Sequence, residues 1–371
     1  MTTTSGTNPK VSIVAVSYNQ EKYIRETLES FVTQQADFAF EVVIGDDKST
    51  DRTPEIIAEY ARAYPDIVKP ILRTKNIGVQ QNFIETLRAA TGEYIAMCEG
   101  DDYWTDIHKL QTQVAFMDKN PDMALSFHPV RVFFEGNEEP DSIYPDPNEK
   151  HVFTLKELLR RNYIQTNSVM YRRQNYDAMP GDSVNMLPVD WYIHLYHAQF
   201  GKIGYINKVM ADYRRHPGGI WWSSYKNVDD IWKRHGLSHL SLFMELLKLY
   251  GDNPEYKKLL YVSVYKLLSA VTSVDEKYQT GQLHQILQVY PDSIEQFVRY
   301  QCGALETSER ALSAAKAQAE ELTSTVTSKD AAIAERDALL DQAAHELRLI
   351  KGSRLWKLRN AIAKVTGRQQ V

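Results

Sequence analysis

The sequence predicts an α/β protein: a mostly parallel sheet with helices on both faces, followed by an all-α region and a long C-terminal helix. Apolar runs alternate with amphipathic segments through the first hundred residues, which is typical of strand–helix–strand units. These runs show no polar alternation, so their strands are expected to be buried on both faces, as in a parallel sheet. From residue 229 onward, apolar residues recur at three- and four-residue spacing, which indicates helices.

The alternating half predicts four strands and three helices. Strands are expected over 10–19, 40–47, 68–74 and 93–99, with helices over 20–34, 49–64 and 78–90. In the first helix Tyr23, Ile24, Leu28 and Phe31 stand at helical spacing. The second helix has Thr53 as its expected N-cap and Pro54 at its first position, although Asp51 also suits the cap.

The later part of the chain is read more coarsely. We expect one strand over 122–134, a Pro-rich surface loop over 137–150 and a helix over 187–200 that is entered through Pro188. A strand or hairpin follows over 201–216. The predicted organisation is a disordered N-terminus (1–9), an α/β domain (10–225), a helical domain (226–302), a coiled coil (303–350) and a basic amphipathic tail (351–371).

Residues 303–350 favour a coiled coil. An apolar residue occupies every seventh position without a break: Leu305, Leu312, Ala319, Val326, Ile333, Leu340 and Leu347. The d-positions are poorer, so the pattern is also compatible with one charged helix packed on the body. We favour the coiled coil, and with it a homo-oligomer, because long isolated helices are marginal without a partner.

Composition bounds the class of protein. Cys98 and Cys302 lie far apart and have no neighbours at metal-ligand spacing, which favours a reducing, cytoplasmic compartment. The polar first ten residues do not read as a signal peptide, and no apolar run is long enough to span a bilayer.

The net charge is −5, yet seven basic residues and no acidic one fall within 348–371. With the apolar stripe in 351–371, this predicts contact with an anionic membrane surface, or docking on a partner; nucleic acid is not an expected partner.

Polar clusters follow each of the first four predicted strands. Because the carboxyl ends of parallel strands meet at one edge of a sheet, these clusters are expected to form one crevice. The sequence IAMCEGDDYW places Glu99, Asp101 and Asp102 at the fourth strand end. Mg²⁺ or Mn²⁺ takes one or two carboxylates together with phosphate oxygens, so the cluster suits a metal-bound diphosphate. An Asp-rich turn that caps the next helix is the structural alternative.

The second strand end predicts a nucleoside pocket. Asp46 and Asp47 precede the helix cap, and a carboxylate there can accept the imide N–H of uracil or the N–H groups of guanine. Tyr18, at the end of the first strand, can stack on a base. Neither the dinucleotide-binding glycine fingerprint nor a P-loop sequence is present.

The ordered set VSIVAVSYNQEKYIRETLESF, EVVIGDDKSTDRT, KNIGVQQNF, GEYIAMCEGDDYW and YRRHPGGIW resembles the family 2 glycosyltransferases, which are inverting enzymes with a GT-A fold. The resemblance covers about residues 10–225. It implies that Asp101 holds the metal and diphosphate, with Glu99 where an Asp is usual. It also implies Asp190 as catalytic base and His216 as a metal or phosphate contact.

The candidate site therefore has four parts. The nucleotide-binding residues are expected to be Ser17, Tyr18, Asn19, Asp46, Asp47, Asn76, Glu99, Gly100 and Asp101. The metal ligands for Mn²⁺ or Mg²⁺ are expected to be Asp101, Asp102 and His216. Asp190 is the expected base, and the acceptor sugar is expected to contact Trp104, Trp191 and Trp221, although buried packing is the usual role of tryptophan.

The predicted function is transfer of a sugar, from a nucleotide-sugar donor with UDP favoured, to a glycan or lipid-linked acceptor by metal-assisted single displacement. A nucleotidyl- or phosphosugar-transferase is the enzymatic alternative, but the loop after the first strand supplies only Lys22 for gripping phosphate. A degenerate transferase that acts as a scaffold through its coiled coil is the non-enzymatic alternative. Glu99 favours that alternative, whereas the retained acidic residues oppose it.

Overall fold

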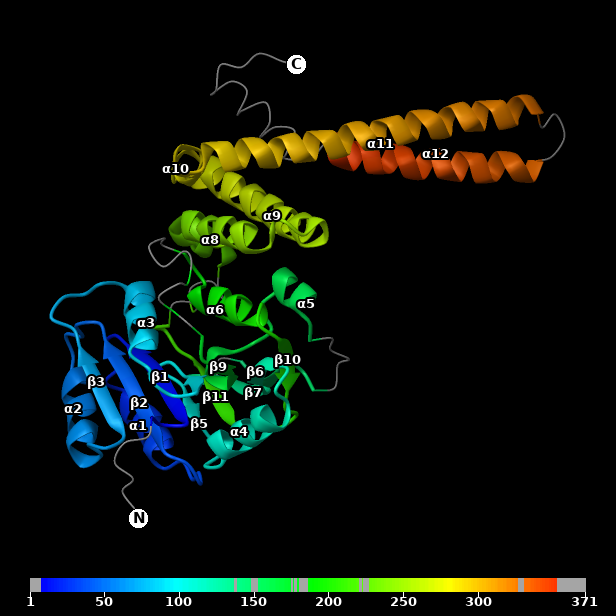
Figure 1. The fold of residues 1–371 in the computed structure, drawn as a ribbon. Helices are drawn as coiled ribbons and strands as arrows, with labels where there is room; N and C mark the ends of the chain where they lie inside the picture. The colour runs from blue at the N-terminus through cyan, green and yellow to red at the C-terminus, as the bar shows by residue number, and fades with distance from the viewer. Residues whose placement is uncertain are drawn as a thin grey trace. The chain divides into compact units, whose positions relative to one another are not determined.

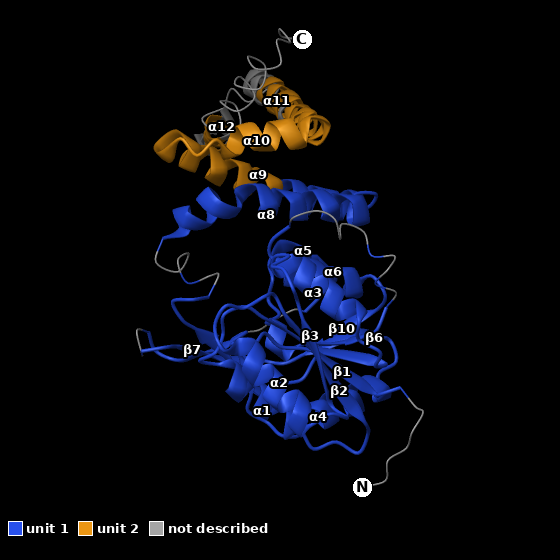
Figure 2. Cartoon of the chain, turned by 90° about the vertical axis from the view of Figure 1, so that its left-hand side faces the viewer, with its two compact units in different colours: residues 1–263 blue, residues 264–371 orange. Residues whose placement is uncertain are grey.

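A computed structural model describes residues 8–136, 139–147, 153–174, 176, 179, 186–219, 222, 227–325 and 330–351. The chain divides into two compact units, residues 1–263 and 264–371 (Figure 2). The first unit contains a seven-stranded sheet of strand order β10-β6-β9-β4-β1-β2-β3 and a four-stranded sheet of order β5-β11-β7-β8 (Figure 1). The mixed α/β fold class predicted from the sequence is thus confirmed.

The strand and helix pairs of the alternating half lie where the sequence predicts them. The strands are β1 (Val11–Ser17), β2 (Phe40–Asp46), β3 (Val68–Leu72) and β4 (Tyr94–Met97). The intervening helices are α1 (Ile24–Val32), α2 (Thr53–Ala63) and α3 (Val79–Arg88). β1 pairs in parallel with both β2 and β4, and β2 pairs in parallel with β3. Their carboxyl ends therefore share one edge of the sheet.

Helices cover both faces of the large sheet. Figure 2 shows α1, α2 and α4 (Lys109–Lys119) on one side and α3 and α6 (Val189–Ala198) on the other. On the α1 side Val11, Ile13 and Ala15 of β1 pack with Phe31 and other buried side chains of these helices. Burying a side chain of this size stabilises the fold by about 1.5–3 kcal/mol, so this core fixes where the strand ends stand.

Three expectations for the first unit need correction. The strand expected over 122–134 is two strands, β6 (Met123–Phe127) and β7 (Val130–Phe134), in different sheets. Pro129 lies between them, and proline lacks the N–H that would continue a ladder. The strand or hairpin expected over 201–216 is likewise split between the sheets, as β10 (Lys202–Tyr205) and β11 (Ala211–Arg215).

The third correction concerns a strand that the sequence analysis did not identify. β9 (Met170–Arg172) pairs antiparallel with both β4 and β6 in the large sheet. The small sheet is completed by β5 (Tyr103–Trp104) and β8 (Ser142–Tyr144). β5 and β9 are too short to produce a periodic signal in the sequence, which explains why they were missed.

The cap of α2 resolves the two alternatives left open by the sequence. Thr53 is the first residue of the helix, not its cap, and Pro54 stands at the first turn. The carboxylate of Asp51 accepts hydrogen bonds from the N–H groups of Thr53 and Glu21, both at 3.0 Å. These bonds lower the pKa of Asp51 against the opposing effect of burial. Asp51 therefore has a structural role.

The remaining helices of the first unit are α5 (Leu155–Arg160), the 3-10 turn η1 (Thr166–Ser168), α8 (Val228–Tyr250) and the beginning of α9 (Pro254–Tyr278). The second unit continues with α10 (Gln282–Val289), α11 (Pro291–Thr325) and α12 (Asp330–Lys351). Within the described parts of the chain, no helix is long and apolar enough to cross a membrane.

The predicted long C-terminal helix is two helices. α11 and α12 lie side by side and contact each other (Figure 1). Part of the apolar heptad series, including Val326, falls outside the described residues. Coiled-coil pairing with a second chain remains a prediction, as do the domain boundaries, the disordered N-terminus and the amphipathic tail; of 351–371 only the first residue is described.

Candidate active site

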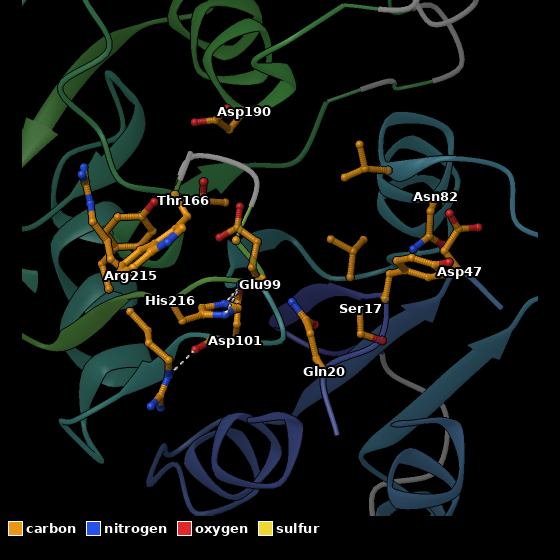
Figure 3. Close-up of a pocket in the computed structure, with 18 of the residues that line it drawn as sticks. Ser17, Gln20, Asp47, Asn82, Glu99, Asp101, Thr166, Asp190, Arg215 and His216 are labelled. Carbon is orange, nitrogen blue, oxygen red and sulfur yellow. Dashed lines mark hydrogen bonds and ion pairs between the residues drawn. The ribbon is translucent and has the colours of Figure 1, made fainter. Parts of the chain in front are cut away.

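A pocket of about 410 Å³ lies where β1, β2 and β4 end (Figure 3). The end of β11, the start of α6 and the turn η1 complete its wall. Its lining residues are Val16, Ser17, Tyr18, Gln20, Asp47, Asn76, Gly78, Val79, Asn82, Glu99, Asp101, Gln165, Thr166, Asp190, Tyr213, Arg214, Arg215, His216, Gly218, Gly219 and Trp222. The strand ends thus form one crevice, as the sequence predicts.

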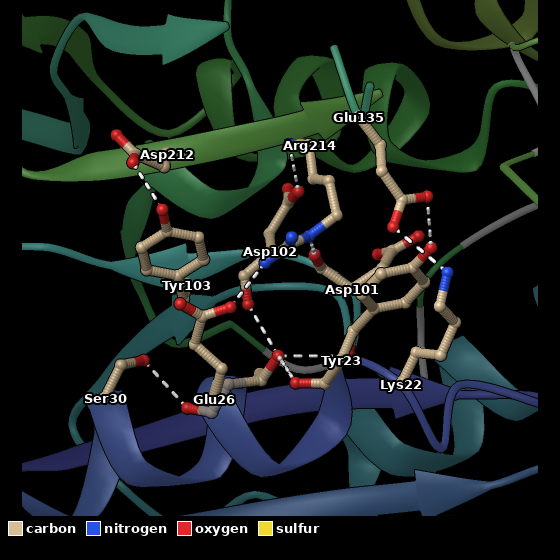
Figure 4. A network of polar contacts seen from close by, with 12 residues as sticks. Lys22, Tyr23, Glu26, Ser30, Asp101, Asp102, Tyr103, Glu135, Asp212 and Arg214 are labelled. Atoms are coloured by element: carbon tan, nitrogen blue, oxygen red, sulfur yellow. Dashed lines mark hydrogen bonds and ion pairs between the residues drawn. The ribbon is translucent and has the colours of Figure 1, made fainter. Parts of the chain in front are cut away.

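The acidic loop after β4 divides its three carboxylates. Glu99 and Asp101 line the pocket, whereas Asp102 does not and is 1% exposed. Asp102 Oδ1 accepts a hydrogen bond of 2.8 Å from the backbone N–H of Arg214 (Figure 4). Burial raises the pKa of Asp102 well above its ordinary value, and the neighbouring Asp101 and Glu99 add to this effect. Asp102 therefore attaches the acidic loop to β11. Its position next to Asp101 in the sequence gave no indication of this role.

Asp101 faces His216 across the floor of the pocket. Asp101 Oδ2 lies 3.0 Å from His216 Nε2, and the imidazole packs at 4.4 Å from the ring of Tyr23. Arg214 holds the same loop, because its Nε donates to the Asp101 carbonyl at 2.9 Å and its Nη2 to Glu26 at 2.5 Å (Figure 4). The tertiary fold thus brings together two residues that are 115 positions apart.

Glu99 stands between this pair and Asp190. Burial, together with the charges of Asp101 and Asp190, raises the pKa of Glu99 to about 8, while a hydrogen bond with Thr166 opposes the shift. The neutral form of Glu99 is therefore favoured relative to an ordinary glutamate as long as no cation offsets the surrounding negative charge. Three carboxylates converge on one pocket, and that arrangement favours a positively charged ligand.

Asp190 lies in the first turn of α6 (Figure 3). Its carboxylate is 22% exposed, and its Oδ2 accepts a hydrogen bond of 2.9 Å from Asn162 Nδ2. Burial raises the pKa of Asp190 to about 6, against hydrogen bonds from the backbone and from Asn162 that favour the ionised form. A carboxylate with this pKa is ionised at neutral pH and is a stronger base than an ordinary aspartate, which suits proton abstraction.

The expected nucleotide-binding residues separate into two groups. Ser17, Tyr18, Asp47 and Asn76 line the pocket, and Tyr18 is 49% exposed, so its ring is available for stacking. Asn19, Asp46 and Gly100 do not line it. Each of these three has a structural role instead.

Asp46 and Asn19 hold the loops that follow β1 and β2. Asp46 accepts hydrogen bonds from the backbone N–H and the hydroxyl of Ser49 and from the hydroxyl of Ser17. Asn19 has a positive φ of 53° and accepts from the N–H of Thr50 at 2.8 Å. At Gly100 a Cβ would collide with Gln20 Oε1 and approach Val16 O at 3.1 Å, so close packing requires glycine there.

Asp47 shapes the wall on which a base would rest. Its Oδ1 accepts from the N–H of Ile77 at 2.7 Å and its Oδ2 from the N–H of Gly78 at 2.9 Å. Asn76 Nδ2 in turn donates to the Asp47 carbonyl at 3.1 Å. Each carboxylate oxygen has a further lone pair, so Asp47 can hold this loop and still accept from a ligand.

Asp47→Asn is expected to destabilise the protein by about 1–3 kcal/mol, because the amide nitrogen cannot accept and leaves one loop N–H unpaired. The midpoint of urea unfolding measures this effect. Asp66→Asn, at an exposed aspartate before β3, is the control and should leave the midpoint unchanged. Equal midpoints for the two variants would contradict the loop-holding role.

The expected acceptor tryptophans do not gather at the pocket. Trp104 is buried, packs on Phe31 and donates from Nε1 to the Asn167 carbonyl at 2.9 Å. Trp191 donates to the Leu158 carbonyl at 2.7 Å, and neither residue lines the pocket. Both are structural, as is usual for tryptophan. Trp221 lies outside the described residues, and its neighbour Trp222 lines the pocket.

Several lining residues were not identified from the sequence. Gln20, Gln165, Thr166 and Arg215 reach the pocket from three different segments, since Gln165 and Thr166 are adjacent. Gln20 Oε1 is buried without a hydrogen-bond partner in the described part of the chain, so it is available to a ligand donor. Gln20 follows the strand-end cluster directly, and extending that cluster by one residue would have found it. Thr166 has no comparable signal.

The residues present fit a hard divalent cation only in part. In the described ranges no three His, Cys, Asp or Glu side chains are grouped closely enough to hold a metal by themselves. The Asp101 carboxylate and the His216 imidazole lie together in the pocket, and Mg²⁺ or Mn²⁺ commonly takes one or two protein ligands and completes its shell with phosphate and water. The pair therefore fits a cation that arrives with a diphosphate, whereas Asp102, also an expected ligand, is buried and does not line the pocket.

Comparison with known proteins identifies the family of this chain. The sequence model described as glycosyl transferase family 2 matches residues 12–177. An uncharacterized protein of Mycobacterium tuberculosis is 48% identical over 246 residues, which cover 66% of this chain and 70% of that protein. The poly(ribitol-phosphate) beta-glucosyltransferase of Bacillus spizizenii is 30% identical over 176 residues, covering 44% of this chain and 27% of that protein.

Among solved structures, the mannosyltransferase PcManGT of Pyrobaculum calidifontis in complex with GDP-Man and Mn²⁺ matches with a TM-score of 0.49 and 18% identity, covering 96% of this chain and 85% of that chain. The sheet order, the pocket at the strand ends and the sequence relatives define an enzyme that transfers glycosyl groups. The chain belongs to glycosyltransferase family 2, and its large mixed sheet followed by helices is the GT-A fold of that family.

Proposed function

We propose that this protein is an inverting glycosyltransferase that moves a sugar from a nucleotide-sugar donor to a glycan or lipid-linked acceptor. The observation that carries the proposal is the placement of Asp190 and the Asp101–His216 pair in one pocket. A single base and a separate site for the leaving diphosphate are what one displacement at the anomeric carbon requires.

In this mechanism Asp190 takes the proton of the acceptor hydroxyl as that oxygen attacks the anomeric carbon. The bond to the diphosphate breaks in the same step, so the sugar inverts. Asp101 and His216 would hold a bound Mn²⁺ or Mg²⁺, which would offset the charge on the departing diphosphate. The raised pKa of Glu99 supports the proposal, because a cation near Asp101 would return that carboxylate to its ionised form.

The donor we favour carries UDP. Tyr18 offers an exposed ring for stacking, and Asp47 lies at the pocket wall with acceptor capacity for an imide N–H. The name of the Bacillus spizizenii relative, a beta-glucosyltransferase of poly(ribitol-phosphate), favours a polymeric acceptor and a role in polysaccharide biosynthesis. The predicted basic tail suits an acceptor presented at the inner face of the cell membrane.

A thermal-shift series with UDP, GDP and dTDP, each with and without Mn²⁺, tests donor class and cation together. UDP with Mn²⁺ is expected to raise the melting temperature most, because a ligand that binds only the folded state stabilises it by about 2.7 kcal/mol at one hundred times its Kd. Mn²⁺ alone should have a smaller effect, since the protein supplies few ligands. No shift with any of the three nucleotides would reject the proposal.

A further inference from the structure

Two buried histidines follow Asp190 on α6, one and two turns later, and each contacts a tyrosine from outside the helix. His194 and His197 are both fully buried, and each ring contacts a tyrosine hydroxyl. His194 Nδ1 lies 2.5 Å from Tyr171 Oη, and His197 Nε2 lies 3.0 Å from Tyr176 Oη. The proposed mechanism uses neither histidine, although buried imidazoles are costly unless they are hydrogen-bonded.

His194 and His197 differ in what the other nitrogen of the ring contacts. His197 Nδ1 is satisfied by the carbonyl of Ile193 at 2.8 Å, within the same helix. His194 Nε2 makes no hydrogen bond of ordinary geometry in the described part of the chain, although the backbone of Ile164 also interacts with this ring, and it lies 3.9 Å from Asp190 Oδ2. That distance exceeds a hydrogen bond, but bonds between catalytic groups and their supports commonly tighten only when substrate binds.

The 2.5 Å contact between Tyr171 Oη and His194 Nδ1 allows either group to be the donor, and we take the tyrosine hydroxyl as the donor. Burial raises the pKa of the Tyr171 hydroxyl well above its ordinary value, so the hydroxyl keeps its proton. Burial also lowers the pKa of His194 to about 3, so the ring is neutral at physiological pH. A buried hydroxyl that donates its proton to Nδ1 leaves the single ring proton on Nε2, the nitrogen that faces Asp190.

We propose that His194, held by Tyr171, is a positioning residue for Asp190. Its Nε2–H and the Asn162 amide both lie toward Oδ2 of Asp190. This leaves Oδ1 free to take the proton of the acceptor hydroxyl. The proposal rests on the proposed function, in which Asp190 is the base. Besides burial, the charge of Asp190 raises the pKa of Glu99 in the acidic loop and of Tyr171 on β9, and His197 on the same helix lowers the pKa of His194.

Tyr171→Phe tests the proposal, with Tyr176→Phe as the matched control. Both changes remove one buried tyrosine–histidine hydrogen bond on the same helix, so both should lower thermal stability to a similar extent. Only Tyr171→Phe should lower kcat, by about 10- to 100-fold, because misplacing a catalytic group has effects of that size. The KM for the nucleotide-sugar should stay within about twofold, since neither tyrosine lines the pocket.

The pH dependence of kcat/KM distinguishes the loss of a contact that positions Asp190 from a general loss of stability. A hydrogen bond to the ionised carboxylate lowers its pKa, so losing that bond raises the pKa of Asp190. The acidic limb of kcat/KM should therefore move to higher pH in Tyr171→Phe and stay in place in Tyr176→Phe. His194→Gln, which keeps an N–H donor at the ε position, should retain more activity than His194→Leu.

Nitrogen-15 NMR of the histidine-labelled wild-type enzyme tests the same proposal without any activity measurement. The signal assigned to His194, by its loss in His194→Gln, should show the neutral Nε2–H tautomer between pH 6 and 8. A neutral Nδ1–H tautomer would overturn the proposal even if the tyrosine variants failed to fold.

Asp190→Asn distinguishes failure of this proposal from failure of the proposed function. Equal activity of Tyr171→Phe and Tyr176→Phe, with Asp190→Asn inactive, would overturn the role of His194 and leave Asp190 as the base. Near-normal activity of Asp190→Asn would overturn both. If both proposals hold, adding Tyr171→Phe to Asp190→Asn should have no further effect on kcat, because the two residues act as one unit.

Discussion

Asp190→Asn is expected to lower kcat by about 10²- to 10⁴-fold, the usual contribution of a general base, while affinity for the nucleotide-sugar is retained. Asparagine keeps the size of the side chain and an oxygen for the Asn162 amide, but it cannot take the acceptor proton. Steady-state kinetics with separate kcat and KM, together with calorimetric titration of the donor, measure the two effects.

The pH dependence of the wild-type enzyme belongs to the same prediction. Burial raises the pKa of Asp190 to about 6, so kcat/KM should rise with pH through that value and level off above it. The sign for stability is the opposite. The folded pKa lies above the ordinary 3.8, so the ionised group weakens folding as pH rises from about 4 through 6, and Asp190→Asn should remove that loss.

A simple helix-dipole role for Asp190 predicts different results. A carboxylate in the first turn of a helix stabilises it by about 0.3–1 kcal/mol, and removing it would reduce stability without affecting turnover. Glu55→Gln, in the first turn of α2 and away from the pocket, is the matched control for this effect. If Asp190→Asn behaved like Glu55→Gln, with turnover near that of the wild type, Asp190 would not be the base.

Asp101→Asn is the second variant with a large expected effect. It is expected to abolish the increase in UDP affinity that Mn²⁺ produces and to lower kcat by about 10²- to 10³-fold, because the leaving diphosphate loses its main electrostatic stabilisation. Titration of UDP in the presence and absence of Mn²⁺ measures the metal-dependent increment directly. His216→Ala should reduce the same increment less, since the carboxylate supplies the charge that attracts the cation.

Asp102→Asn is the control because it changes the adjacent carboxylate, which does not line the pocket. The asparagine oxygen can still accept from the Arg214 N–H, so the acidic loop stays attached to β11. Metal-dependent UDP affinity should be preserved in this variant. Equal losses in Asp101→Asn and Asp102→Asn, or a full Mn²⁺ effect in Asp101→Asn, would contradict the assignment.

The alternating half of the fold was predictable because its signal is local. β1, β2 and their helices depend on runs and periodic patterns of apolar residues that lie within a few positions of one another. The later strands were not predictable to the same extent. β6 and β7 form one apolar run in the sequence but belong to different sheets, and β9 joins the large sheet through pairing with distant strands. Such pairing depends on contacts across the fold, which no local pattern records.

The candidate site shows the same division. The clustering of Ser17, Tyr18, Asp47 and Glu99 followed from the geometry of parallel strand ends. The sequence did not show which member of each acidic pair lines the pocket, because consecutive side chains leave the backbone in different directions. Only the packing of the loops places Asp101 rather than Asp102, and Asp47 rather than Asp46, in the lining of the pocket.

The sequence alone determined the class of fold, the edge of the sheet where the candidate site lies, and the acidic character of that edge. The tertiary structure decided which carboxylates face the ligand, that His216 meets Asp101, and that buried His194 stands behind Asp190. The physical reason is the separation along the chain over which each effect acts. Strand and helix preferences act between near neighbours in the chain, whereas burial, pKa and hydrogen-bond partners depend on residues that only folding brings together.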